Sequence, residues 1–174
     1  MAPDTARLAL VPLSGDEARA QLAGVPDCLA WAEGFPGAGD LVAASRIVSG
    51  EWPTATAEVP WGVWVILERG TGLAIGGIGF KSVPDVTGSV EIGYGLTPAF
   101  WGRGLATEAV TAITSTGHRH GARVVRAITD DVNFASRRVL EKCGYTQVQQ
   151  DGEEIHWAHV VTPYSRRTSV SPAP

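Results

Sequence analysis

The stretch Glu91–Ala109, "EIGYGLTPAFWGRGLATEA", constrains the fold of this 174-residue chain more than any other. Its first residues have a strand pattern, and a helical pattern begins near Leu105, after the run Gly102-Arg103-Gly104. A helix N-terminus leaves backbone N–H groups without partners at the positive end of the helix dipole, and the glycines let an anion approach closely. We therefore predict that this turn binds a pyrophosphate.

Two familiar phosphate motifs fit this run poorly. The P-loop requires a lysine followed by serine or threonine, and no such lysine is present here. The dinucleotide fingerprint requires a third glycine where Thr107 stands, together with repeated parallel units. A glycine-rich turn without any ligand remains the alternative interpretation.

The pattern of the rest of the chain predicts a mixed sheet with helices. Turn signals at Gly70-Thr71-Gly72 and Asp151-Gly152 predict hairpins. The segment Glu91–Thr129 should form a right-handed parallel crossover. We expect strands at Leu8–Val11, 63–67, 73–80, Ser89–Leu96, Val124–Thr129, 145–150 and 153–161, and helices at 14–23, Leu41–Ser49, Leu105–His118 and Phe134–Cys143.

Composition describes an ordinary globular protein, with 44% hydrophobic and 18% charged residues. No apolar run would span a bilayer, and the first residues lack a secretory pattern, so we expect a cytoplasmic protein without membrane association. Cys28 and Cys143 are too few for a disulfide framework or zinc cluster, and we expect both to be reduced. Residues 1–162 are predicted to form one domain, and 163–174 a disordered tail.

The charge is unevenly distributed along the chain. The net charge of -4 argues against a nucleic-acid binder. The segment between Trp101 and Tyr145, however, contains six Arg and one Lys but only two Glu and two Asp, a local net charge of +3. A basic segment in an acidic chain indicates a specific anionic ligand, although a solvated basic face is the simpler alternative.

The run "EIGYGLTPAFWGRGLATEA" followed by "NFASRRVLEKCGY" resembles the GNAT superfamily of acyl-coenzyme A-dependent N-acyltransferases. Within it, the sequence is most similar to the ribosomal-protein N-terminal (alanine/serine) acetyltransferases. The resemblance implies an α/β (α+β) fold: a mixed, mostly antiparallel sheet of about seven strands with a V-shaped splay, flanked by about four helices. It also implies acetyl transfer from acetyl-CoA to a primary amine, a peptide N-terminus or a small molecule.

The resemblance also implies which residues hold coenzyme A. The family's phosphate loop has a polar first residue, where this chain has Trp101, but the backbone donors of the loop remain. Asn133 matches the family's pantetheine-binding asparagine, and a helix cap is an equally good role for it. The expected cofactor-binding residues are Leu96, Arg103, Gly104, Leu105, Ala106, Thr107, Asn133 and Arg138.

The resemblance identifies the catalytic residues less directly than the cofactor-binding ones. Many family members carry a tyrosine late in the last helix to protonate the thiolate, and this chain has Leu140 there, so Ser136 becomes the candidate general acid. Glu91 is the first choice of base, and a structural hydrogen bond is its alternative role. His156 or His159 is the second choice. A bulge in the Glu91–Leu96 strand and the break after Leu96 should splay this strand from the one at Val124–Thr129. Unpaired N–H groups near Gly95 and Leu96 should then polarise the thioester carbonyl.

Other interpretations stay open. A non-catalytic acyl-CoA-binding module would keep the same fold, and turnover would separate the two. We reject a metal site, because His156 and His159 should face opposite sides of a strand. An open sheet edge is compatible with a homodimer.

Overall fold

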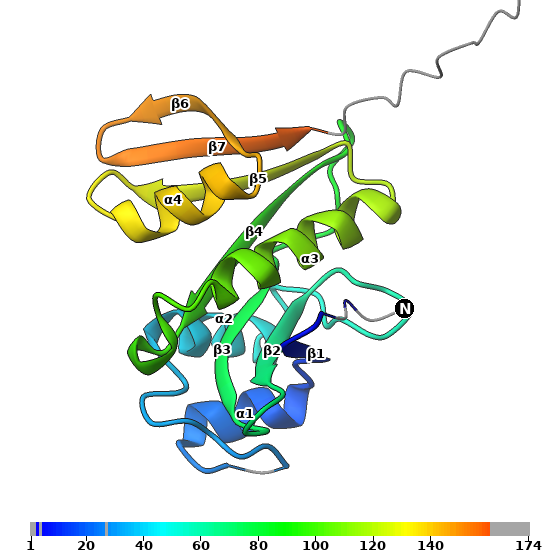
Figure 1. Cartoon of the computed structure of the whole chain (residues 1–174). Coiled ribbons are helices and arrows are strands. Elements are labelled where there is room, and N and C mark those ends of the chain that lie inside the picture. Colours follow the sequence, from blue (N-terminus) through cyan, green and yellow to red (C-terminus); the bar gives the residue numbers. More distant parts are fainter. Residues whose placement is uncertain (1–2, 4, 27, 161–174) are drawn as a thin grey trace, which may run out of the picture.

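The computed structural model describes residues 3, 5–26 and 28–160, which form a seven-stranded sheet with four α-helices (Figure 1). The strand order is β1-β2-β3-β4-β5-β7-β6, and only β4 and β5 are parallel. The predicted mixed, mostly antiparallel sheet is therefore confirmed, while the predicted tail lies outside the described residues. The elements are β1 (Leu8–Pro12), α1 (Gly15–Ala23), α2 (Ala38–Val48), β2 (Val63–Glu68), β3 (Ala74–Phe80), β4 (Ser89–Leu96), a 3₁₀ turn (Pro98–Phe100), α3 (Leu105–Arg119), β5 (Val124–Asp130), α4 (Phe134–Lys142), β6 (Thr146–Asp151) and β7 (Glu154–Val160).

The sheet splits between its two parallel strands. β4 pairs with β5 over three residues only, and the last pair joins Glu91 to Arg126. Beyond it the strands diverge, as Figure 1 shows, so the predicted splay is confirmed. The predicted bulge in β4 is wrong, because β4 keeps an unbroken register with β3 from Ile92 to Leu96. The split therefore comes from the early end of the parallel pairing.

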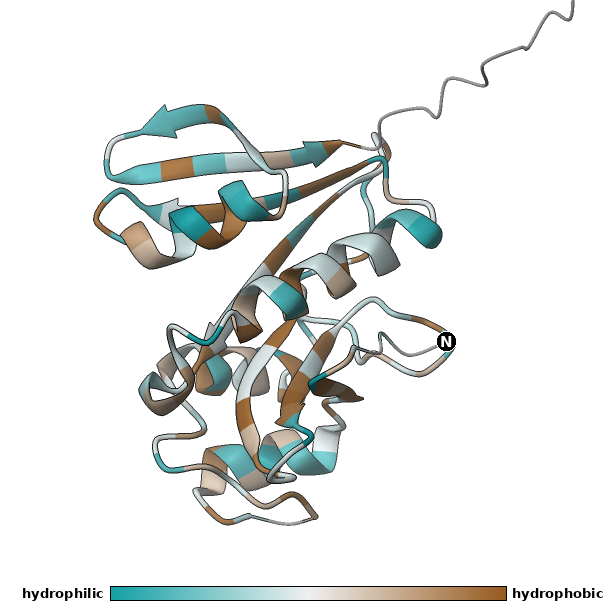
Figure 2. Cartoon of the chain, viewed as in Figure 1, coloured by the Kyte–Doolittle hydropathy of each residue, from teal (hydrophilic) through white to brown (hydrophobic). Residues whose placement is uncertain are grey.

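Alternate residues of β2 supply two separate cores. Trp64 and Ile66 belong to the cluster that α3 covers, whereas Val63 and Val65 belong to the cluster under α1 and α2. This is the two-residue period of a strand buried on both faces. In Figure 2 the central strands are largely hydrophobic and β6, at the edge, is largely hydrophilic. Helices therefore lie on both faces of the sheet beside the split.

The two N-terminal helices begin with side-chain caps. Ser14 Oγ accepts a hydrogen bond from the Glu17 N–H at 3.1 Å, which confirms the predicted start of α1. α2 begins at Ala38, three residues before the predicted Leu41. The reason is that Asp40 Oδ2 accepts the Gly37 N–H at 2.9 Å and so satisfies a donor at the start of the helix.

The packing of α3 against the sheet generates a first prediction. Ile113 is fully buried between α3 and the sheet. Replacing it with alanine should lower the free energy of unfolding by about 2–4 kcal/mol, because it removes buried methyl groups and leaves a cavity. Val86→Ala, at a fully exposed position, should change it by less than about 0.5 kcal/mol. Urea denaturation of both variants measures the difference, and equal effects would contradict the described core.

Candidate acyl-coenzyme A and amine site

The glycine turn places a helix N-terminus at the open end of the split. Gly102 and Gly104 have φ of 71° and 75°, in the left-handed region that favours glycine. Gly104 caps α3 without a side-chain hydrogen bond. Within the described part of the chain, no acceptor binds the N–H groups of Leu105, Ala106 or Thr107. These three donors, at the positive end of the α3 dipole, form a candidate anion site.

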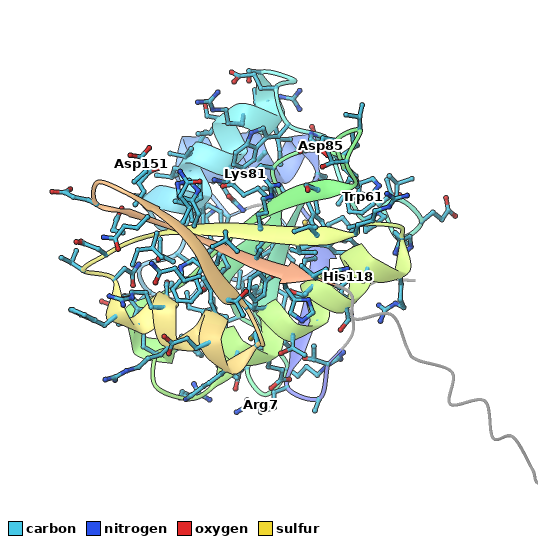
Figure 3. The ribbon with its side chains drawn as sticks, turned by 90° about the horizontal axis from the view of Figure 1, so that it is seen from above. Arg7, Trp61, Lys81, Asp85, His118 and Asp151 are labelled. Atoms are coloured by element: carbon cyan, nitrogen blue, oxygen red, sulfur yellow. The ribbon has the colours of Figure 1, made fainter. Side chains whose placement is uncertain are left out.

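Arg7 holds this turn from the far end of the sequence. Its Nε lies 2.6 Å from Glu108 Oε2, and its Nη1 donates to the Arg103 carbonyl at 2.8 Å. Arg7, labelled in Figure 3, comes from the segment before β1. Sequence reasoning missed this residue, because 101 residues separate Arg7 from Glu108 and no local pattern joins them. The ion pair fixes the first turn of α3.

Two side chains of the loop bind the protein itself. Arg103 forms an ion pair of 3.1 Å with Glu68 and lies 5.1 Å from the centre of the Phe100 ring. The indole Nε1 of Trp101 donates to the Leu96 carbonyl at 2.7 Å. Trp101, the departure from the family loop, therefore joins the loop to the end of β4 and leaves the helix donors free.

Alternate residues of β4 direct their backbone N–H and C=O groups toward the split. The Thr97 N–H donates to the Ile75 carbonyl at 2.8 Å, and the Lys81 N–H to the Glu91 carbonyl at 3.0 Å. Hydrogen bonding alternates along an antiparallel ladder. The backbone N–H and C=O groups of the odd-numbered residues of β4 therefore point toward β3, and those of the even-numbered residues point toward the split. The Leu96 N–H therefore points into the split as expected. The Gly95 N–H does not, because Gly95 pairs with Gly77 of β3.

The start of α4 lies across the split from β4. Asn133 Oδ1 caps the helix by accepting the Ser136 N–H at 3.1 Å. The Tyr94 hydroxyl of β4 donates to the Ser136 carbonyl at 3.1 Å, and burial raises the pKa of Tyr94 to about 12. Tyr94 therefore connects β4 to α4 across the split, beside the candidate general acid Ser136. Sequence reasoning missed this contact. Arg138 is exposed and Leu140 is fully buried.

A cavity of about 630 Å³ lies on the α2 side of β3 and β4. Asp40 of α2 and Lys81 both line it. Burial raises the pKa of Asp40 to about 6, and the hydrogen bond from Gly37 opposes that shift. The backbone floor is rich in glycine, so little side-chain volume fills the cavity there. Other lining residues include Gly77, Gly93, Gly95, Leu96, Thr97 and Trp52.

The three candidate bases lie in different surroundings. Glu91 forms an ion pair with Lys81, and the lining of the cavity includes Lys81 but not Glu91. His159 Nδ1 lies 2.9 Å from His118 Nε2, and burial, followed by the neighbouring His118, lowers the pKa of His159. His156 lies 3.9 Å from Glu154. None of these residues therefore faces the cavity as an unpaired carboxylate or imidazole, within the residues described.

Neither a metal cluster nor a membrane span occurs in the described part of the chain. No group of three or more His, Cys, Asp and Glu side chains there has the geometry to hold a metal ion. None of the helices found there has both the length and the apolar character needed to cross a bilayer.

The family model described as "Acetyltransferase (GNAT) domain" matches residues 7–146. The chain belongs to the GNAT acetyltransferase family. The match covers β1 to β5, the glycine turn and α4, and therefore includes both strands that border the split, while β7 lies beyond it.

Curated relatives of this GNAT protein match over shorter stretches. The uncharacterized N-acetyltransferase YjdG of Bacillus subtilis (strain 168) is 28% identical over 98 residues, 56% of this chain and 58% of YjdG. The uncharacterized N-acetyltransferase YoaA of the same strain is 35% identical over 83 residues, 47% of each chain. The chain thus spans about half the length of the curated relatives it matches.

Solved structures share the fold at low sequence identity. A GNAT-family acetyltransferase from Bacillus anthracis has a TM-score of 0.63 at 17% identity, covering 92% of this chain and 98% of its own. RimL, a ribosomal L7/L12 alpha-N-protein acetyltransferase in complex with coenzyme A, has 0.61 at 16%, covering 90% and 95%. A spermidine N-acetyltransferase SpeG chimera from Vibrio cholerae and hSSAT has 0.63 at 11%, covering 89% and 96%.

The open helix N-terminus generates a prediction on ligand binding. Gly104→Val should weaken coenzyme A binding by at least about 100-fold, because valine is strained at this φ and its branches lie beside the free donors. Isothermal titration calorimetry measures the affinity. Gly121→Val is the matched control, since Gly121 also has positive φ (99°) in open space but follows the far end of α3. If Gly104→Val and wild type bind coenzyme A with equal affinity, the glycine turn is not part of the site.

The burial of Asp40 generates a prediction on stability. A carboxyl whose pKa is higher in the folded state than in the unfolded state destabilises the fold as pH rises from its ordinary pKa of 3.8 through about 6. Asparagine carries no charge, so Asp40→Asn should become more stable relative to wild type by about 1–2 kcal/mol between about pH 4.5 and pH 7.5. Denaturant titrations at the two pH values measure this. A difference that stays constant would contradict the raised pKa.

Proposed function

We propose that this GNAT protein transfers the acetyl group of acetyl-CoA to a primary amine by direct attack. The observation that carries the proposal is the set of free N–H groups at Leu105, Ala106 and Thr107, which open α3 beside the split between β4 and β5. A diphosphate at these donors would direct the rest of a long, thin molecule into the split. Coenzyme A has that shape, and the RimL structure contains it.

The donor would be held by the residues named from the sequence. Gly104, Leu105, Ala106 and Thr107 would bind the diphosphate through the backbone. Asn133 at the start of α4 would contact the pantetheine arm, and Arg138 is exposed one turn further on for a phosphate. Arg103 contributes mainly through its own N–H, because its guanidinium is already paired with Glu68.

Acetyl transfer then requires activation of the thioester and of the leaving thiolate. The Leu96 N–H, directed into the split, would donate to the carbonyl oxygen and stabilise the negative charge that develops there. Ser136, half-buried at the start of α4, is the proposed general acid for the thiolate. Glu91 is the base that the sequence favoured. Its carboxylate is already paired with Lys81.

The acceptor class is proposed more broadly. RimL acts on a ribosomal protein N-terminus by its name, and the SpeG chimera is named for spermidine, and both present a primary amine. The second candidate function is a non-catalytic acyl-CoA-binding module. The observation that favours it is Leu140, which is buried where many relatives carry a proton-donating tyrosine.

Turnover separates these candidates. Thiol release from acetyl-CoA should occur with at least one member of a panel of N-terminal peptides, polyamines and amino acid amides. Ser136→Ala should reduce kcat with that acceptor by about 10- to 100-fold, and the dissociation constant for coenzyme A should stay within about twofold.

The control is Ser115→Ala, at an exposed position on the far half of α3, which should keep the wild-type kcat. Coenzyme A binding without thiol release for any acceptor would reject the transferase and support the binding module. Failure to bind coenzyme A would reject both.

A further inference from the structure

The cavity under α2 contains a carboxylate, that of Asp40, without an ion-pair partner among the described residues. Asp40 Oδ2 accepts the Gly37 N–H, while its Oδ1 lies against Gly77, where a Cβ would collide with it. Glycine at position 77 therefore makes the room that this carboxylate occupies. Within the described residues Asp40 forms no ion pair, and its burial has no charged partner to offset it. Asp40 is half-buried, and a carboxylate that loses solvent without gaining a partner of opposite charge is costly; such groups concentrate at functional sites.

Other charged groups at this cavity are already paired. Arg46, which follows Asp40 on α2, forms an ion pair with Glu51, and Lys81 forms one with Glu91. Tyr94 faces the cavity from β4 with its hydroxyl bonded to the Ser136 carbonyl. Asp40 is thus the ionisable group at the cavity that lacks a partner of opposite charge, among the residues described.

A second polar group in the same cavity has no partner. Thr97 is 4% exposed and lines the cavity, and its hydroxyl forms no hydrogen bond within the described residues. A buried hydroxyl without a partner costs free energy unless a ligand or a water satisfies it. Thr97 directly follows Leu96, whose N–H faces the split. The cavity and the split therefore meet at the end of β4.

We propose that Asp40 binds the ammonium group of the acceptor and takes its proton before the nitrogen attacks the thioester, and that Thr97 hydrogen-bonds to the bound acceptor. This inference rests on the proposed acetyl transfer and names the residue that prepares the amine. It replaces Glu91 in that role and assigns Glu91 to holding Lys81.

The proton and bond changes balance. The ammonium gives one proton to the Asp40 carboxylate, and the free nitrogen lone pair forms a bond to the thioester carbon. When the carbon–sulfur bond breaks, the nitrogen loses its second proton and the thiolate gains one, through Ser136. Asp40 then releases its proton to water. A carboxyl with a pKa raised to about 6 stays mostly ionised at neutral pH, yet it is a stronger base than an exposed aspartate.

The lining also indicates the kind of amine. The floor at Gly77, Gly93 and Gly95 carries no side chains, and a Cβ at Gly95 would meet nothing within 4 Å. Trp52 and Val42 add apolar surface. The cavity therefore fits a primary ammonium attached to an apolar or peptide-like group.

The test compares two aspartates that each lie in the first turn of a helix. Asp40→Asn keeps an oxygen that accepts the Gly37 N–H but cannot take a proton from the amine. With the acceptor found in the thiol-release panel, it should lower kcat/KM at neutral pH by about 100-fold or more. The acidic limb of the kcat/KM profile, centred near pH 6 in wild type, should disappear. Asp16→Asn, in the exposed first turn of α1, should keep the wild-type rate and profile.

An unchanged acidic limb, or a loss in kcat/KM below about threefold, would overturn the role of Asp40 while the transferase stands. If no acceptor releases thiol, a measurement without turnover decides. Protein with ¹³C-labelled aspartate, saturated with coenzyme A, is titrated by NMR with alaninamide and with spermidine. The resonance missing in Asp40→Asn should shift when one of these amines binds. No shift with either amine would overturn the inference independently of the proposed function.

Discussion

The early end of the parallel pairing between β4 and β5 is the constraint on which the rest of the site depends. At the closed end the strands share three residue pairs, and Phe80, Val90 and Val125 pack there into one core. Gly117 of α3 lies so close to Phe80 that a Cβ would crowd its ring. This tight packing holds the strands together, and after Glu91 nothing requires them to stay paired. Their unpaired backbone groups then become available to a ligand.

Local patterns in the sequence were enough to predict the elements of the fold. Glycine turns, the Ser14 cap and the apolar periods gave the order of strands and helices, because each of these signals acts over a few residues. The start of α2 was placed too late although its signal is also local. Its cap is the Asp40 carboxylate, and the signal lies within a glycine-rich segment without clear periodicity.

The geometry of the candidate site could be predicted only where it consists of backbone. The free donors after Gly104 follow from the position of the helix start, which the sequence marks clearly. The contacts Arg7–Glu108 and Tyr94–Ser136 join residues 101 and 42 positions apart, and no single-sequence pattern reports such pairs. The bulge in β4 and the free N–H of Gly95 were wrong, because ladder register is decided by the neighbouring strand β3.

The Arg7 contact has a consequence for how the protein matures during synthesis. During synthesis, the partners of Arg7 at the glycine turn emerge about a hundred residues after Arg7 itself. Until β1 docks against β2, the beginning of α3 lacks the guanidinium that fixes its first turn. The free donors at the start of α3 therefore become rigidly placed in a nascent chain only after the segment that carries Arg7 has docked beside the sheet.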